Sequence, residues 1–155
     1  MTVALWRIGA TTLKYAADDM SGAGAKNTGG RWNPAGIAVV YSSENIALAV
    51  LETLVTLRSG GLPLNRYLIR IDVPDDVWAA RQVLTPPVGW DARPVGMSSV
   101  QAGQAWLISQ ASALLVVPSV IVPEESNVLI NPLHPDARHV VATALRKWHY
   151  DPRYF

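Results

Sequence analysis

Short apolar runs, most of them ended by glycine, proline or serine, recur along the whole sequence and limit what it can fold into. They are Ala4–Ile8, "GIAVVYS" (36–42), "NRYLIRIDVP" (65–74), "ALLVVPS" (113–119) and "NVLINP" (127–132). Runs of this length and β-branched content predict strands, and 65–74 alternates apolar and polar residues as a half-exposed strand does. We expect the terminal stretch 139–155 to add a further strand and, in part, helix.

Helical periodicity marks two further segments. From Glu44 to Arg58, apolar residues recur three and four positions apart, with Ser43 placed to cap the start and Gly60-Gly61 to end the helix. A second helix is predicted over 99–110, beyond the proline-rich stretch 86–94. No internal repeat or long linker divides the chain. We therefore expect one α/β or α+β domain covering residues 1–155.

The composition fits a soluble globular protein and excludes several other classes. Half of the 155 residues are hydrophobic and 16% are charged, which is enough apolar material for one real core. Thirteen Lys and Arg residues balance twelve Asp and Glu residues, so no basic surface is available to bind DNA nonspecifically. Cysteine is absent, the opening "MTVALWRIGATTLKY" does not read as a signal peptide, and no apolar run reaches the roughly 20 residues of a membrane helix. We expect a cytoplasmic protein without disulfides.

Three familiar catalytic motifs are excluded by their spacing. The segment "GAGAKNTGGR" has glycines like a phosphate loop, but Lys and Ser or Thr do not follow them. The segment "VGMSS" lacks the second glycine of a nucleophile elbow. His134 and His139 are five positions apart, which does not stack two ligands on one helical face. We therefore expect neither an ATPase, nor an elbow-type hydrolase, nor a metal site.

Two charged residues stand where packing alone would not select them. Arg31 follows "GAGAKNTGG", a run with few side chains to pack a core and a high entropic cost of ordering. Glu52 borders the apolar face of the predicted helix, where a carboxylate is either partly desolvated or points just past the boundary into solvent. The pattern leaves both interpretations of Glu52 open.

Other polar residues lie within or beside the predicted strands. Arg7 is either an edge residue that reaches water or a buried guanidinium that awaits an anion. Tyr41 ends a strand, where a ring packs in the core and its hydroxyl lies at the rim. Ser126 and Asn127 open another strand and are typical of a turn. Each residue taken alone has an ordinary structural explanation.

Six segments, in this order, carry a family resemblance. They are "LWRI", "SGAGAKNTGGRWNPAG", "VVYSSENIALAVLETLV", "LPLNRYLIRIDVPDD", "ESNVLINPLHPDA" and "YDPRYF". Together they resemble the RES domain, a family named after an Arg, a Glu and a Ser, over essentially the whole chain. The resemblance implies a single RES domain over residues 1–155. It also implies an α+β fold similar to that of the ADP-ribosyltransferases, with short strands around a central sheet and flanking helices.

The resemblance also implies a function and a site. RES proteins are toxins of bacterial toxin–antitoxin modules, encoded with an Xre-type helix-turn-helix antitoxin, and their substrate is NAD⁺. Members break the nicotinamide–ribose bond with water or phosphate as acceptor, or pass ADP-ribose to a protein. Six residues match the family's functional positions: Arg31, Glu52 and Ser126, which correspond to its name, and the pocket residues Arg7, Tyr41 and Asn127. The ADP-ribosyltransferase glutamate lies late in the chain on a strand, so its detailed role is not carried over to the mid-chain, helical acid found here.

The chemistry of NAD⁺ cleavage gives the charged residues expected roles. The ribosyl centre becomes oxocarbenium-like and the leaving group is already cationic, so no catalytic histidine is needed. The guanidinium groups of Arg31 and Arg7 would hold the pyrophosphate, approached through the glycine-rich loop. Glu52 would accept a hydrogen bond from a ribose hydroxyl and face the developing cation.

The polar residues take positioning roles in the same interpretation. Tyr41 would pack against nicotinamide or ribose. Ser126 and Asn127 would position phosphate or ribose by hydrogen bonding, and Ser126 is not expected to be a nucleophile because no base is evident.

We expect an NAD⁺-consuming toxin, with degradation of NAD⁺ favoured over mono-ADP-ribosylation of a host protein. Arg31→Ala and Glu52→Ala are expected to abolish toxicity with little change in thermal stability. A non-enzymatic alternative is a co-repressor module that binds the antitoxin, for which six tryptophans offer interface material. The expected partners are NAD⁺ and an Xre-family antitoxin, with DNA contacted only through that antitoxin. The sequence leaves a homodimer open.

Overall fold

The computed structural model describes residues 1–57 and 63–154. Within these residues, seven strands form one sheet in the order β4-β5-β6-β2-β1-β3-β7. The strands are β1 Thr2–Ala10, β2 Val40–Ser43, β3 Arg66–Pro74, β4 Gln82–Val83, β5 Leu114–Pro118, β6 Ser126–Ile130 and β7 Val141–Lys147. Neighbouring strands run antiparallel except for β4 and β5. The predicted strands are present, and the α+β class is confirmed.

The two helices predicted over 44–58 and 99–110 are present as α2 and α4 with shifted boundaries, whereas α1 and α3 were not predicted. In the described part of the chain they are α1 Ala23–Thr28, α2 Ile46–Leu54, α3 Asp75–Ala79, α4 Met97–Ser109, and the 3₁₀ helices η1 Pro135–His139 and η2 Pro152–Tyr154. The cap of α2 is Asn45, whose side chain accepts a hydrogen bond from the Leu48 amide at 2.8 Å. The expected cap, Ser43, is instead paired in β2. The predicted stop at Gly60-Gly61 lies outside the described residues.

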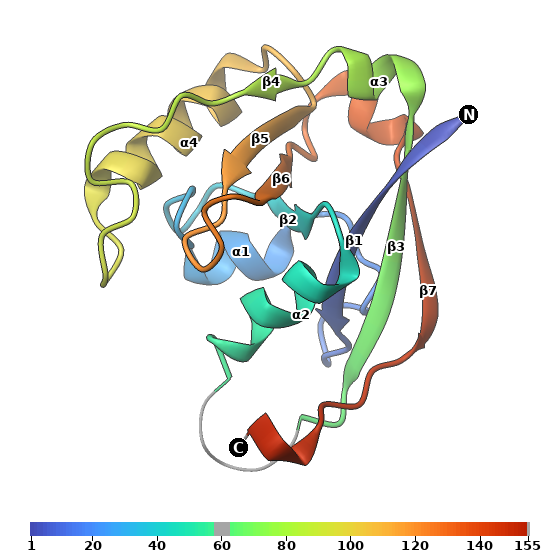
Figure 1. Cartoon of the computed structure of the whole chain (residues 1–155). Helices are drawn as coiled ribbons and strands as arrows, with labels where there is room; N and C mark the ends of the chain where they lie inside the picture. Colours follow the sequence, from blue (N-terminus) through green and yellow to red (C-terminus); the bar gives the residue numbers. More distant parts are fainter. Residues whose placement is uncertain (58–62, 155) are drawn as a thin grey trace.

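The sheet folds back on itself around a shared core. β1 pairs with β3 along its full length but meets β2 at a single position, Trp6 opposite Ser43. Leu5 from the β1 side packs in one buried cluster with Val116 and Val128 from β5 and β6. The half of the sheet formed by β4, β5, β6 and β2 therefore shares a core with the half formed by β1, β3 and β7. Figure 1 shows β5 and β6 set apart from the long β1, β3 and β7 strands.

Two helices cover the outer faces of these halves. On the β5–β6 half, Trp106 of α4 packs against Leu115 and Leu129. On the other half, α2 lies beside β1 (Figure 1), and Ala49 packs in a cluster with Ile8. This arrangement brings α2 to the place where β1 and β2 part. No helix in the described ranges is both long and apolar enough to span a membrane.

The glycine-rich segment has more regular structure than the sequence predicts. Helix α1 lies inside it, and Trp32 and Asn33 just after it are buried, at 3% and 1% exposure. The Trp32 backbone approaches Gly103 of α4 so closely that a Cβ there would overlap the Trp32 carbonyl. No residue of α1 is buried, so the glycine-rich run itself adds little to the core, and Trp32 directly after it supplies the core side chain.

Candidate active site

A cleft of about 490 Å³ opens where β1 and β2 separate. These antiparallel strands pair only at Trp6 and Ser43. Beyond this pair, Arg7 and Ile8 of β1 and Tyr41 and Ser42 of β2 line the cleft. Helix α2, the turn at Gly29–Arg31 and the start of β6 complete the walls. Five of the six predicted site residues line this cleft: Arg7, Arg31, Tyr41, Glu52 and Asn127.

The Glu52 carboxylate is fixed by a hydrogen bond at each oxygen. Ser119 Oγ donates to Oε1 at 3.0 Å, and Asn127 Nδ2 donates to Oε2 at 3.0 Å. The Asn127 amide is oriented in turn, because its Oδ1 accepts a hydrogen bond from Ser43 Oγ at 2.6 Å. Of the two interpretations that the sequence left open, the structure selects the one in which Glu52 faces a lined cleft. Its carboxylate is positioned before any substrate enters.

Ser119 is the site residue that the sequence analysis missed. It is fully buried, and its Oγ accepts hydrogen bonds from the amides of Ile121 and Val122 while donating to Glu52. It directly follows β5, so its position depends on the pairing of β5 with β6. The only sequence signal is a polar residue that ends the apolar run "ALLVVPS", which is also the signal of an ordinary turn.

Arg31 anchors a distant loop as well as facing the cleft. Its Nη1 donates to the carbonyls of Trp90 at 2.9 Å and Ala92 at 3.0 Å. The Trp90 ring stacks on Trp32, with centroids 6.2 Å apart. Burial, and then the nearby Arg93, lower the pKa of Arg31, while Glu52 acts in the opposite direction. Part of the guanidinium expected to hold pyrophosphate is therefore committed to the protein itself.

Tyr41 holds the turn that carries Arg31. Its Oη donates to Asn33 Oδ1 at 2.6 Å and accepts from the Trp32 amide at 3.0 Å, so the hydroxyl does not lie free at the rim. Burial is the main cause that raises the pKa of Tyr41 above its ordinary value. A Cβ at Gly30 would lie 2.7 Å from Tyr41 Oη, so glycine is needed there for this approach. We call the contacts of the Tyr41 hydroxyl with Asn33 and the Trp32 amide the clamp. Gly30, the second glycine of "GGRWN", leaves room for it, and the Tyr41 ring lines the cleft.

Asn33 is the other half of this clamp and was not singled out in the sequence. Its Nδ2 lies within hydrogen-bond distance of three carbonyls, those of Ala25, Pro34 and Ile37, at 2.9 to 3.2 Å. Its Oδ1 accepts from Tyr41. These contacts explain why an amide is buried between α1 and β2. They also rigidify the backbone on both sides of Arg31.

Arg7 is half-buried and is not an edge residue, because β1 lies between β2 and β3 in the sheet. It lines the cleft on one side and a second, smaller cavity on the other. Within the described residues, its Nε is buried and has no hydrogen-bond partner. Burial is the main cause that lowers the pKa of Arg7, and Asp19 and Tyr15 act in the opposite direction. A buried guanidinium in this state favours an anionic ligand.

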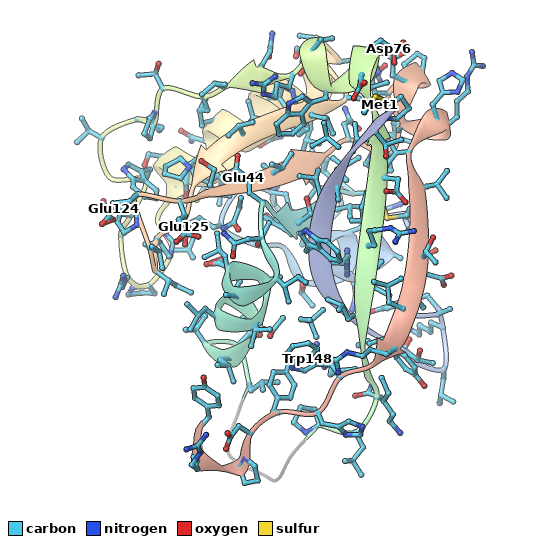
Figure 2. All side chains as sticks on the ribbon, turned by 45° about the vertical axis from the view of Figure 1, so that its right-hand side comes forward. Met1, Glu44, Asp76, Glu124, Glu125 and Trp148 are labelled. Atoms are coloured by element: carbon cyan, nitrogen blue, oxygen red, sulfur yellow. The ribbon has the colours of Figure 1, made fainter. Side chains whose placement is uncertain are left out.

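Ser126 is not brought together with the other predicted site residues. It opens β6, and its carbonyl accepts a hydrogen bond from the Glu44 amide at 3.3 Å. Figure 2 shows Glu44, Glu124 and Glu125 grouped at this end of the molecule. Successive residues of a strand face opposite sides of the sheet. Because Asn127 lines the cleft, Ser126 lies on the face of β6 away from the cleft. Of the serines near Glu52, it is Ser119 that contacts the carboxylate.

No group of three or more His, Cys, Asp or Glu side chains in residues 1–57 and 63–154 is arranged to hold a metal ion. His134, weighed in the sequence as a ligand, accepts a hydrogen bond from the Asp136 amide at 3.0 Å and so caps η1. The site is built from guanidinium, carboxylate, hydroxyl and amide groups.

Comparison with known proteins gives the family. Residues 4–152 match the RES domain model. The chain is 60% identical to a Prs ADP-ribosylating toxin of Sphingobium sp. (strain YBL2), over 99% of this chain and 97% of that protein. It is also 33% identical to a Toxin Res of Yersinia enterocolitica, over 90% and 93%, and 40% identical to a Toxin Res of Pseudomonas putida, over 86% and 88%. The predicted resemblance is confirmed: this chain belongs to the RES-domain family.

Proposed function

We propose that this protein is an NAD⁺-using toxin that transfers ADP-ribose to a protein. The observation that carries the proposal is the Glu52 carboxylate, held at both oxygens and facing a cleft that Arg7 and Arg31 also line. The similarity to a Prs ADP-ribosylating toxin over nearly the whole length of both chains supports transfer to a protein over degradation of NAD⁺. We propose Prs as the acceptor on the same ground.

The fixed carboxylate suits the charge that develops during this reaction. The bond between the ribose C1′ and the nicotinamide nitrogen breaks, and its electron pair leaves with neutral nicotinamide. The ribosyl centre then carries positive charge, which a preorganised carboxylate stabilises without reorganisation. A lone pair of the acceptor forms the new bond to C1′, and the acceptor releases a proton to solvent. Each Glu52 oxygen keeps a further lone pair, so a ribose hydroxyl can also donate to it.

The surrounding residues supply binding and shape. Arg7 offers a buried positive charge for the pyrophosphate. Arg31 offers its remaining guanidinium donors, and its bonds to Trp90 and Ala92 keep the group in place. The Tyr41 ring forms a flat wall for nicotinamide or ribose.

The mouth of the cleft is apolar and suits a protein partner. Val55 and Val95 line the cleft and are 66% and 45% exposed. Exposed apolar side chains around a polar site are typical of a surface that contacts another protein. We propose that both the protein acceptor and an Xre-family antitoxin contact this rim in the cytoplasm. Any contact to DNA would belong to the antitoxin.

A transfer assay tests the proposed activity. Purified protein is incubated with Prs and NAD⁺ labelled in its adenylate half, and the label on Prs and the release of nicotinamide are both measured. We expect labelled Prs with the wild type and none with Glu52→Gln. The matched control is Glu124→Gln, which changes an exposed acid outside the cleft and should label Prs like the wild type. Nicotinamide release without a label on any protein would show NAD⁺ degradation instead, and no release at all would reject the proposal.

A further inference from the structure

A second cavity of about 210 Å³ lies directly beside the cleft. Arg7, Ile8, Ala25 and Tyr41 line both hollows, so these residues form the wall between them. Arg7 is the charged residue among the four. The two hollows therefore form neighbouring compartments of one region.

Two arginines from adjacent strands give this cavity its charge. Arg7 comes from β1 and Arg66 opens β3, beside Ala10 at the end of the β1–β3 pairing. Asp19 and Tyr15, from the segment after β1, also line this cavity. One acid against two guanidinium groups leaves a net positive charge in a confined space.

Both guanidinium groups have an unsatisfied buried donor. In the part of the chain that the structure describes, Nε of Arg7 and Nε of Arg66 are buried and make no hydrogen bond. Asp19 makes no ion pair with Arg7 or Arg66. Its Oδ2 accepts hydrogen bonds from the Ser21 amide at 3.3 Å and the Ser21 hydroxyl at 2.6 Å. Buried N–H donors without a partner are rare in native proteins and are stabilised by a ligand that accepts from them.

Arg7 has a desolvation cost that its neighbours do not fully offset. Burial is the largest cause that lowers the pKa of Arg7, Asp19 and then Tyr15 oppose the shift, and Arg66 adds a smaller lowering effect. A phosphate oxygen between the two guanidinium groups would relieve both the desolvation and the mutual repulsion.

We propose that this second cavity is a nucleotide-phosphate subsite that holds the adenosine-phosphate end of NAD⁺, with Arg66 as a binding residue. The inference rests on the proposed function, because it takes the ribose beside Glu52 as the reacting one. Arg7, between the compartments, then lies at the pyrophosphate that joins the two halves of the dinucleotide. Arg66 lies beyond it and binds the adenylate phosphate.

Calorimetric titration with ADP tests the subsite without any turnover. We expect ADP to bind the wild type and Arg66→Gln to weaken binding about tenfold or more, as loss of a hydrogen bond to a charged group implies. The matched control is Arg70→Gln, which removes another β3 arginine that pairs with Asp72 and lies outside both cavities. It should leave ADP affinity unchanged. Asp19→Asn should tighten ADP binding, because it removes the opposing charge.

Further arms separate this inference from the proposed function. If Arg66→Gln does not fold, Arg66→Lys keeps the charge but loses the planar donors and should still weaken ADP binding several-fold. If the wild type cleaves NAD⁺ while Arg66 variants keep wild-type ADP affinity, the subsite is wrong and the function stands. Absence of ADP binding by the wild type overturns the subsite, and inorganic phosphate binding as tightly as ADP overturns its assignment to a nucleotide. ADP binding that depends on Arg66 supports the subsite even if no transfer occurs.

Discussion

Removing the Tyr41 hydroxyl should destabilise the protein by an amount that the clamp around it predicts. Tyr41→Phe deletes the hydrogen bond to Asn33 Oδ1 and the one from the Trp32 amide, and both partners belong to buried residues. Each unsatisfied buried group costs about 1–3 kcal/mol, so we expect a loss of about 3 kcal/mol in the free energy of unfolding. For a chain of this size that corresponds to a fall in Tm of about 6–12 °C. The ring remains, so the cleft keeps its wall.

Thermal unfolding followed by circular dichroism measures this effect. Tyr154→Phe is the matched control, because Tyr154 is 63% exposed and its hydroxyl makes no hydrogen bond within the described residues. It should leave Tm unchanged. If Tyr41→Phe unfolds at the wild-type temperature but loses NAD⁺ cleavage, the hydroxyl acts on substrate and the clamp argument is refuted. If Tm falls as predicted, residual activity at low temperature should persist.

Four further predictions concern the same residues. Glu52→Gln should lower NAD⁺ cleavage at least about 100-fold because charge is lost, and Tm should fall only modestly because one of the two accepted hydrogen bonds is lost; a large fall in Tm would indicate a structural role. Ser119→Ala should lower kcat with little change in KM, since it frees the Glu52 carboxylate, and wild-type kcat would argue against that positioning. Gly30→Ala should destabilise the protein in thermal melts, because its Cβ would meet Tyr41 Oη. Because burial raises the pKa of Tyr41 above its ordinary 10.0, the wild type should lose stability above about pH 10 in urea melts, and Tyr41→Phe should lose less.

The sequence predicted the elements better than their junctions. Strands 65–74 and 113–119 were visible because apolar composition and alternation are local properties. The cap of α2 was misplaced because Ser43 and Asn45 are both good caps, and only the pairing of Ser43 with Asn127 decides between them. Helix α1 was missed because Gly24 within it and Gly22 and Gly29 beside it lower the helix propensity of the segment.

Site residues that stand out by residue type could be predicted from the sequence. Those whose role depends on a contact with a distant residue could not. Arg31 and Glu52 were singled out because charged residues in glycine-rich or apolar surroundings are unusual, and the resemblance to the RES domain then assigned them to a site. Ser119 was not found, because its role depends on a hydrogen bond to a residue 67 positions away. The clamp of Tyr41 on Asn33 is equally invisible in a pattern. Such contacts arise only after β1, β2, β5 and β6 have assembled.

The distance in sequence between Glu52 and its two hydrogen-bond donors has a consequence for synthesis. The donors follow it by 67 and 75 positions, so a growing chain exposes the carboxylate long before Ser119 and Asn127 leave the ribosome. Nascent chains, and products of premature termination before residue 119, lack the groups that orient it. The oriented carboxylate can therefore form only after Asn127 has been synthesised, and products truncated before residue 119 should be harmless.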